Sequence, residues 1–263
     1  MGLFYNYNKE GPGVRKKGPN KRVFIRFFEA YFRNAWKMIP VCFLYCLFLI
    51  VPGFSAVGIT GVSRSISRDK HSFGVSDFFS TIKKNWKQAL AVGIINIIVT
   101  VILILDFSFF TRVSNTVLKL VGTGISLFLL FLFTVMKYYV WFLIITFDMS
   151  VSKIYSNSFK FFVINMKNNM IMFVSTSIFW VIFYLLLEMR LVTPLIAGIL
   201  MVIMICFYPL FHYLIIQFGI FGSIKKYIID PYYAENPDAD IEKRRALGLD
   251  TGEETEPDFE DIL

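Results

Sequence analysis

Uncharged apolar runs alternate along the chain with short segments in which aromatic and basic residues recur at helical spacing. Residues 76–110 contain both patterns. In residues 76–88 an apolar helix face alternates with lysines, which is typical of a helix lying in a membrane interface. Residues 89–105 carry no charge, and the run through Phe110 is long enough to cross about 30 Å of hydrocarbon. This stretch predicts an interfacial helix, here called an elbow, that turns into a transmembrane helix. The elbow residues are Phe78, Phe79, Lys83, Lys84, Trp86 and Lys87.

Two other segments show the same alternation of aromatic and basic residues. They span residues 23–37, which include Trp36, and residues 153–169. An apolar run follows each, so the pattern predicts three units, each an elbow with a pair of transmembrane helices. The heptapeptides WFLIITF at 141–147 and HYLIIQF at 212–218 fit an internal repeat, or resemble each other because apolar segments share a composition.

The first apolar run is too short for a straight span. Residues 38–51 fall short of the roughly twenty residues needed, and they end at Pro52 and Gly53. Either residues 38–62 form one kinked span, or the chain turns near Pro52 and returns. Lys and Arg crowd both the segment before residue 38 and residues 64–87, whereas residues 107–116 hold only Arg112. The positive-inside rule favours the return. We therefore expect six transmembrane helices, the first pair short, with five as the alternative, and both termini in the cytoplasm.

The composition agrees with an all-α, polytopic helical membrane protein. Hydrophobic residues make up 56% of the 263 residues, above the 45 to 50% usual for soluble domains. The formal charge of +8 lies mainly beside the apolar runs, so we expect contact with anionic lipid headgroups of the bilayer and not with nucleic acid. We divide the chain into a basic polar arm (1–22), a transmembrane domain (23–229) and an acidic tail (230–263) whose composition predicts disorder.

Motifs for catalysis or metal binding do not occur in the sequence. The three cysteines lie in apolar runs, and two histidines in the whole chain do not indicate a metal site. No phosphate-binding loop, zinc-protease motif or nucleophile elbow is present. We expect no catalytic residue, no cofactor and no enzymatic activity.

A few polar residues in or beside the apolar runs are candidates for ligand contact. A charge inside a bilayer is costly unless it is paired or hydrated, so such residues are often functional. Each also has a plainer interpretation, because charges at helix ends reach the interface and polar groups hydrogen-bond between helices. The candidates are Lys137, His212, Gln217, Asp106 and Asp148.

Several short motifs resemble, in their order, the YesL-like family of bacterial integral membrane proteins. They are MGLF at 1–4, an apolar helix ending near Pro52, FFSTIKKNWKQA at 78–89, LD at 105–106 and FD at 147–148. The family has no established activity, and its genes often lie beside genes for carbohydrate uptake and degradation. The resemblance implies a multi-pass protein of a bacterial cell membrane with a connection to sugar utilisation.

Two classes of function remain open at this point. The first is a non-enzymatic accessory or regulatory factor that acts on a transporter subunit or a membrane sensor. The second is a small transporter or channel component with a polar path through the third to sixth predicted helices. The sequence offers few polar residues for such a path: Asn96, Thr100, Thr134, Lys137, Thr146, His212 and Gln217.

Overall fold

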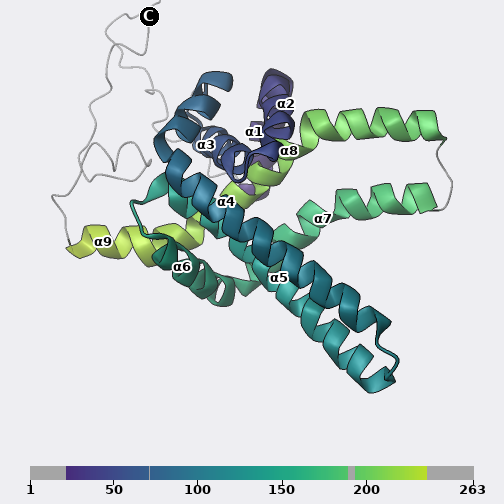
Figure 1. Cartoon of the computed structure of the whole chain (residues 1–263). Helices are drawn as coiled ribbons and strands as arrows, with labels where there is room; N and C mark the ends of the chain where they lie inside the picture. The colour runs from purple at the N-terminus through teal and green to yellow at the C-terminus, as the bar shows by residue number, and fades with distance from the viewer. Residues whose placement is uncertain (1–21, 71, 189–192, 236–263) are drawn as a thin grey trace, which may run out of the picture.

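The computed structural model describes residues 22–70, 72–188 and 193–235, and every regular element within them is helical (Figure 1). The all-α expectation is therefore confirmed for this part of the chain. Residues 230–235, assigned above to the acidic tail, are helical, whereas the remainder of that tail and residues 1–21 lie outside the described residues. The α-helices are α1 (Val23–Asn34), α2 (Ile39–Leu47), α3 (Phe54–Ser67), α4 (Val75–Arg112), α5 (Thr116–Thr146), α6 (Val151–Ile164), α7 (Met166–Glu188), α8 (Pro194–Ile224) and α9 (Asp230–Glu235), joined by the short turns η1 (Trp36–Met38), η2 (Phe48–Ile50) and η3 (Lys225–Ile229).

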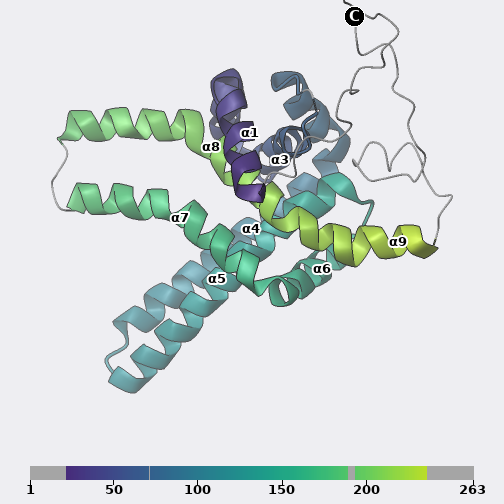
Figure 2. The ribbon, with the colours of Figure 1, turned by 180° about the vertical axis from the view of Figure 1, so that it is seen from behind.

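Two long helical hairpins project from a central body in different directions (Figures 1 and 2). One hairpin is α4 with α5, and the other is α7 with α8. The Asn115 side chain caps α5 by accepting a hydrogen bond from the Leu118 amide at 3.0 Å. Pro194 occupies the first turn of α8, where its missing N–H has no helical acceptor to lose. These four helices are long and apolar enough to cross a membrane.

The first apolar run is not one continuous helix. Helical structure stops at Ile50, Val51 is extended, and Gly53 adopts φ 81° before α3 begins. α2 and α3 then pack against each other and against α8. At 14 residues, α3 is about 21 Å long, which is less than the hydrocarbon thickness. The described residues thus give four spans. A fifth is possible if α1 and the helical segment from η1 to η2, which meet at an angle of 57°, together form one bent span.

Helix α4 contains two of the predicted elements. Residues 76–88, predicted to be an elbow that turns into a transmembrane helix, and the apolar run after them form a single helix of 38 residues. No proline lies between residues 75 and 112, and a single glycine, Gly93, does not suffice to interrupt a helix. At the third expected elbow the helix does end, because α6 stops at Ile164 and α7 begins at Met166.

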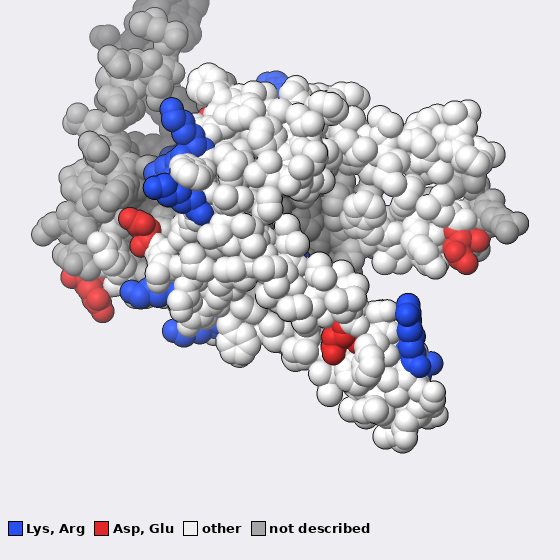
Figure 3. All heavy atoms as spheres, in the orientation of Figure 1, with Lys and Arg blue, Asp and Glu red and all other residues white. Residues whose placement is uncertain are grey.

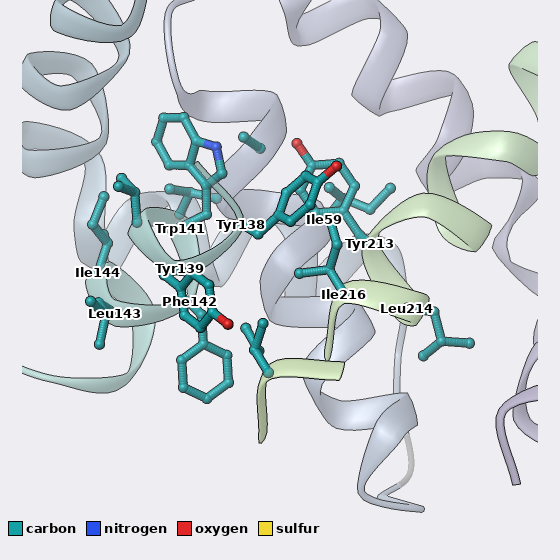
Figure 4. Packing of buried hydrophobic residues seen from close by; sticks show 14 of the residues in the cluster. Ile59, Tyr138, Tyr139, Trp141, Phe142, Leu143, Ile144, Tyr213, Leu214 and Ile216 are labelled. Atoms are coloured by element: carbon teal, nitrogen blue, oxygen red, sulfur yellow. The ribbon is translucent and has the colours of Figure 1, made fainter. Parts of the chain in front are cut away.

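The core of the protein surrounds α3. Residues 55–63 of this helix are all buried, against α4, α5 and α8. Tyr138 of α5 and Tyr213 of α8 lie close to Ile59 of α3 in the middle of this core, and Trp141, Phe142, Leu143 and Ile144 continue it along α5 (Figure 4). The two heptapeptides named above lie in this core.

The projecting halves of the hairpins have the opposite character. Their surfaces expose large apolar side chains, for example Ile98, Leu120 and Leu195, which is the surface expected of helices in lipid. The space-filling view shows these arms almost free of charge except near their tips, whereas Lys and Arg gather over the central body (Figure 3).

Candidate functional site

Buried hydroxyl groups converge on Thr176 of α7. The Tyr138 hydroxyl from α5 lies 3.1 Å from Thr176 Oγ1, and the Tyr208 hydroxyl from α8 donates to the Thr176 carbonyl at 2.6 Å. Tyr208 also lies 3.3 Å from Nδ1 of His212, one turn further along α8. Pro209 lies inside α8 between them and removes one backbone donor. The result is a polar cluster that joins three spans.

His212, one of the candidates named from the sequence, belongs to this cluster, and Lys137, another candidate, precedes its member Tyr138 in α5. The His212 ring packs edge-on against the ring of Tyr138, the residue that follows Lys137, with centroids 5.8 Å apart. Lys137 is half-buried, and its ammonium lies 5.5 Å from the centre of the Phe133 ring. It is nine residues before the end of α5, a distance of about 14 Å along the helix axis. Among the described residues it has no carboxylate partner within salt-bridge distance.

A second polar cluster joins α5 to the corner between α6 and α7. The Tyr139 hydroxyl donates to Oδ1 of Asn169 at 2.7 Å and accepts from Nδ2 of Asn165 at 2.8 Å. Nδ2 of Asn169 donates to the carbonyl of Phe162, at the end of α6. Asn169 therefore satisfies a carbonyl at the end of α6, where a broken helix leaves carbonyls without helical partners.

The other polar candidates are distributed over the molecule. Ser126 of α5 donates to the Asp106 carboxylate of α4, near the tip of the first hairpin. Asp148 is exposed just beyond the opposite end of α5. Gln217 is buried in α8, and its Nε2 has no hydrogen-bond partner within the described part of the chain. The structure therefore brings Lys137 and His212 together, and does not bring Asp106 and Asp148 together.

The elbow residues divide into an exposed and a buried group. Trp36 is 75% exposed, and Lys87 lies 5.6 Å from the ring of Trp86. Phe78, in contrast, is fully buried, and its ring fills the space left by the missing side chain of Gly58. At Phe78, therefore, α3 covers the apolar face of the helix, which the sequence pattern does not distinguish from a face covered by lipid. The exposed group consists of Trp36, Phe79, Lys83, Lys84, Trp86 and Lys87.

The hydroxyl and amide groups of these clusters form hydrogen bonds, and their arrangement does not match that of a known catalytic site. Most hydroxyl and amide groups in them are paired with one another or with backbone carbonyls. No group of three or more His, Cys, Asp or Glu able to hold a metal ion occurs among the described residues. Sequence reasoning missed Thr176, Asn165 and Asn169. The i, i+4 spacing of the two asparagines was the available signal.

The fold and these sites define a multi-pass helical membrane protein. Residues 30–107, less than half of the chain, match the model of a family described as "Protein of unknown function, DUF624". The matched segment runs from α1 through most of α4 and includes the break at Gly53. The chain matches no curated protein and no solved structure.

Proposed function

We propose that this protein is a non-enzymatic accessory or regulatory factor of the cell membrane. One observation carries the proposal: the polar groups inside the bundle bond to one another across helices. The hydroxyls around Thr176 and the amides around Tyr139 hold spans together, which is the use that polar side chains commonly have in membrane bundles. A carrier needs polar groups that face water or a substrate instead.

The proposed topology places both termini in the cytoplasm. In this arrangement α2 and α3 form the short first pair, which enters the bilayer from the cytoplasmic side and returns to it. The two hairpins supply four full crossings. An even number of passes puts the lysines and arginines of residues 64–87 and 153–167 inside and the hairpin tips outside, in keeping with the positive-inside rule. The three-unit plan of elbows and helix pairs remains part of this proposal.

The proposed partner is a transporter subunit or a membrane sensor. The exposed aromatic and basic side chains in the segments 23–37 and 79–87 form a surface at one face of the membrane to which this partner can bind. The proposed connection to carbohydrate uptake or sensing in bacteria rests on the resemblance to the YesL-like family. We propose no catalytic role, no cofactor and no nucleic-acid partner.

The second candidate is a small transporter or channel component. It is favoured by Lys137, a half-buried charge in a span, and by buried amide nitrogens of Asn96 and Gln217 that have no partner within the described residues. These groups are the ones that a polar path would use.

Flux measurements separate the two candidates. The purified full chain is reconstituted in liposomes and tested with labelled oligosaccharides and ions, beside Lys137→Ala and His212→Ala. The accessory proposal expects no flux above empty liposomes. Flux that these variants abolish, while their unfolding stays normal, establishes the carrier.

A further inference from the structure

A cavity of about 290 Å³ lies between the end of α3, the first turns of α4 and the end of α5. Two cationic side chains line it, Arg64 from α3 and Lys84 from α4. Gly61, Thr81 and Ile145 form parts of its wall. The cavity is separate from the cluster around Thr176, which involves α5, α7 and α8.

Arg64 is held rigidly but only partly satisfied. Its Nη1 donates to the Ile145 carbonyl at 2.9 Å and to Thr146 Oγ1 at 3.0 Å. A cation at this place also complements the negative end of the α5 dipole. These two bonds leave the Nε and Nη2 donors of the guanidinium without a hydrogen-bond partner among the described residues. A fixed guanidinium with free donors is a preformed half of a bidentate anion site.

Positive charge accumulates around this cavity. Arg68, one turn beyond Arg64, lies with its guanidinium 4.7 Å from the centre of the Phe221 ring. Its Nη2 is buried without a hydrogen-bond partner in the described structure. Burial, and then the nearby charge of Arg64, lower the pKa of Arg68 to about 10. Both arginines also lower the pKa of Lys70, after burial.

The carboxylates of Asp77 and Asp69 offset only part of this positive charge. Asp77 lines the cavity, but its Oδ2 accepts hydrogen bonds from Ser72 Oγ at 2.8 Å and from the Phe73 amide at 3.0 Å. Asp69 pairs with Arg33 at 2.6 Å, on the other side of the loop. Asp77 keeps its negative charge, because both of its hydrogen-bond donors are neutral, but it forms no salt bridge with Arg64 or Lys84. The two cations that line the cavity therefore exceed the one carboxylate that lines it.

We propose that this cavity binds a phosphate group, supplied by the headgroup of an anionic phospholipid or by free phosphate. The free Nε and Nη2 donors of Arg64 bind two phosphate oxygens, and the flexible Lys84 ammonium approaches a third. Arg68 and Lys70 add a longer-range attraction. Phosphate suits the site because guanidinium and phosphate match in geometry as well as in charge.

The test compares two lysines of the same helix. Both lysines are exposed, but only Lys84 lines the cavity, so Lys84→Gln and Lys83→Gln remove the same charge from different places. Native mass spectrometry of the purified full chain counts retained phosphatidylglycerol and phosphatidylcholine. Thermal unfolding with inorganic phosphate, against chloride at equal ionic strength, measures the free anion. Arg64→Lys, which keeps the charge but loses the paired donors, is the third variant.

We expect the wild type to retain phosphatidylglycerol over phosphatidylcholine, or to be stabilised by phosphate over chloride. The first result would show that a lipid headgroup supplies the bound phosphate group, and the second that free phosphate supplies it. Lys84→Gln and Arg64→Lys should each weaken that binding about tenfold, the effect of losing one charge-assisted bond, with Lys83→Gln within about twofold of the wild type. Equal losses in Lys84→Gln and Lys83→Gln, or a wild type that prefers neither ligand, overturn the proposal.

Discussion

The Tyr139 hydroxyl and Oδ1 of Asn169 lie 2.7 Å apart, and both residues are completely buried. This bond joins α5, two turns before its end, to the first turn of α7, across the corner where α6 ends. The Tyr139 ring also stacks on Phe161 of α6, with centroids 5.2 Å apart. One tyrosine thus positions the second hairpin relative to the first.

Replacing Tyr139 by Phe should destabilise the bundle. The change keeps the ring but leaves the amides of Asn165 and Asn169 without their shared partner, which costs about 1 to 3 kcal/mol. Unfolding of the purified protein in increasing SDS measures the loss. The control is Tyr184→Phe, since Tyr184 is 61% exposed on the outer half of α7. Equal midpoints for the two variants would show that the buried bond contributes nothing.

The break between α2 and α3 depends on a close approach to α4. A methyl group at Gly93 would overlap the backbone of Pro52 and Gly53, whereas a methyl group at Gly124 meets nothing within 4 Å. Gly93→Ala should therefore cost about 1 to 3 kcal/mol through overpacking. Gly124→Ala should be neutral or stabilising by up to about 1 kcal/mol. Unfolding in increasing SDS measures both changes. If Gly93→Ala is as stable as Gly124→Ala, the close contact of Gly93 with Pro52 and Gly53 is not present.

The topology is accessible to thiol labelling. Single cysteines replace Ser76, at the start of α4, and Ser114, at the tip of the first hairpin, in a background free of other cysteines. Both positions are exposed. An impermeant reagent added to intact cells should label position 114 and spare position 76 until the membrane is opened. Labelling of position 76 from outside reverses the orientation of α4 and removes the support for cytoplasmic termini.

The contact between α6 and α4 should weaken at high pH. The Tyr155 hydroxyl donates to Oδ1 of Asn96 at 2.9 Å, and burial raises the pKa of Tyr155 from 10.0 to about 12. A pKa raised on folding gives a stabilisation that is complete below pH 10 and is lost as the pH rises to about 12.

The test is the difference in unfolding midpoint between the wild type and Tyr155→Phe, measured at about pH 9 and about pH 12. We expect this difference to shrink at the higher pH. Tyr227→Phe, which changes an exposed ring near the end of the described chain, provides the control. A difference that stays constant with pH would mean that Tyr155 does not carry this contact.

Much of the architecture could be predicted from the sequence, because uncharged runs of about twenty residues have few alternatives to a transmembrane helix. The apolar run after Ala89, and those of α5, α7 and α8, are of this kind. Pro52 and Gly53 marked a place where helical structure is interrupted, and the structure breaks there. The expectation of six transmembrane helices with a short first pair goes further than the described residues, which give four spans or up to five; α3 is buried within the protein and is shorter than a span.

The parts that could not be predicted depend on which neighbour covers a helix face. Phe78 and Phe79 are adjacent and chemically alike, yet Phe78 is buried against α3 and Phe79 is exposed. Periodicity identifies the apolar face and cannot say whether lipid or protein covers it. The cluster at Thr176 was missed for a related reason, because its members come from three helices that are distant in the sequence.

The central claim, that the protein acts through a partner at the membrane surface, is tested most directly by site-specific photocrosslinking. A photoreactive residue replaces Trp36 or Lys83 in the expected contact surface, and Ile98 on the apolar arm of α4 as the control. After irradiation of native membranes, adducts are identified by mass. The account predicts one discrete transporter subunit or sensor at positions 36 and 83 and none at position 98. Adducts of lipid alone at all three positions, together with flux in liposomes, would contradict it.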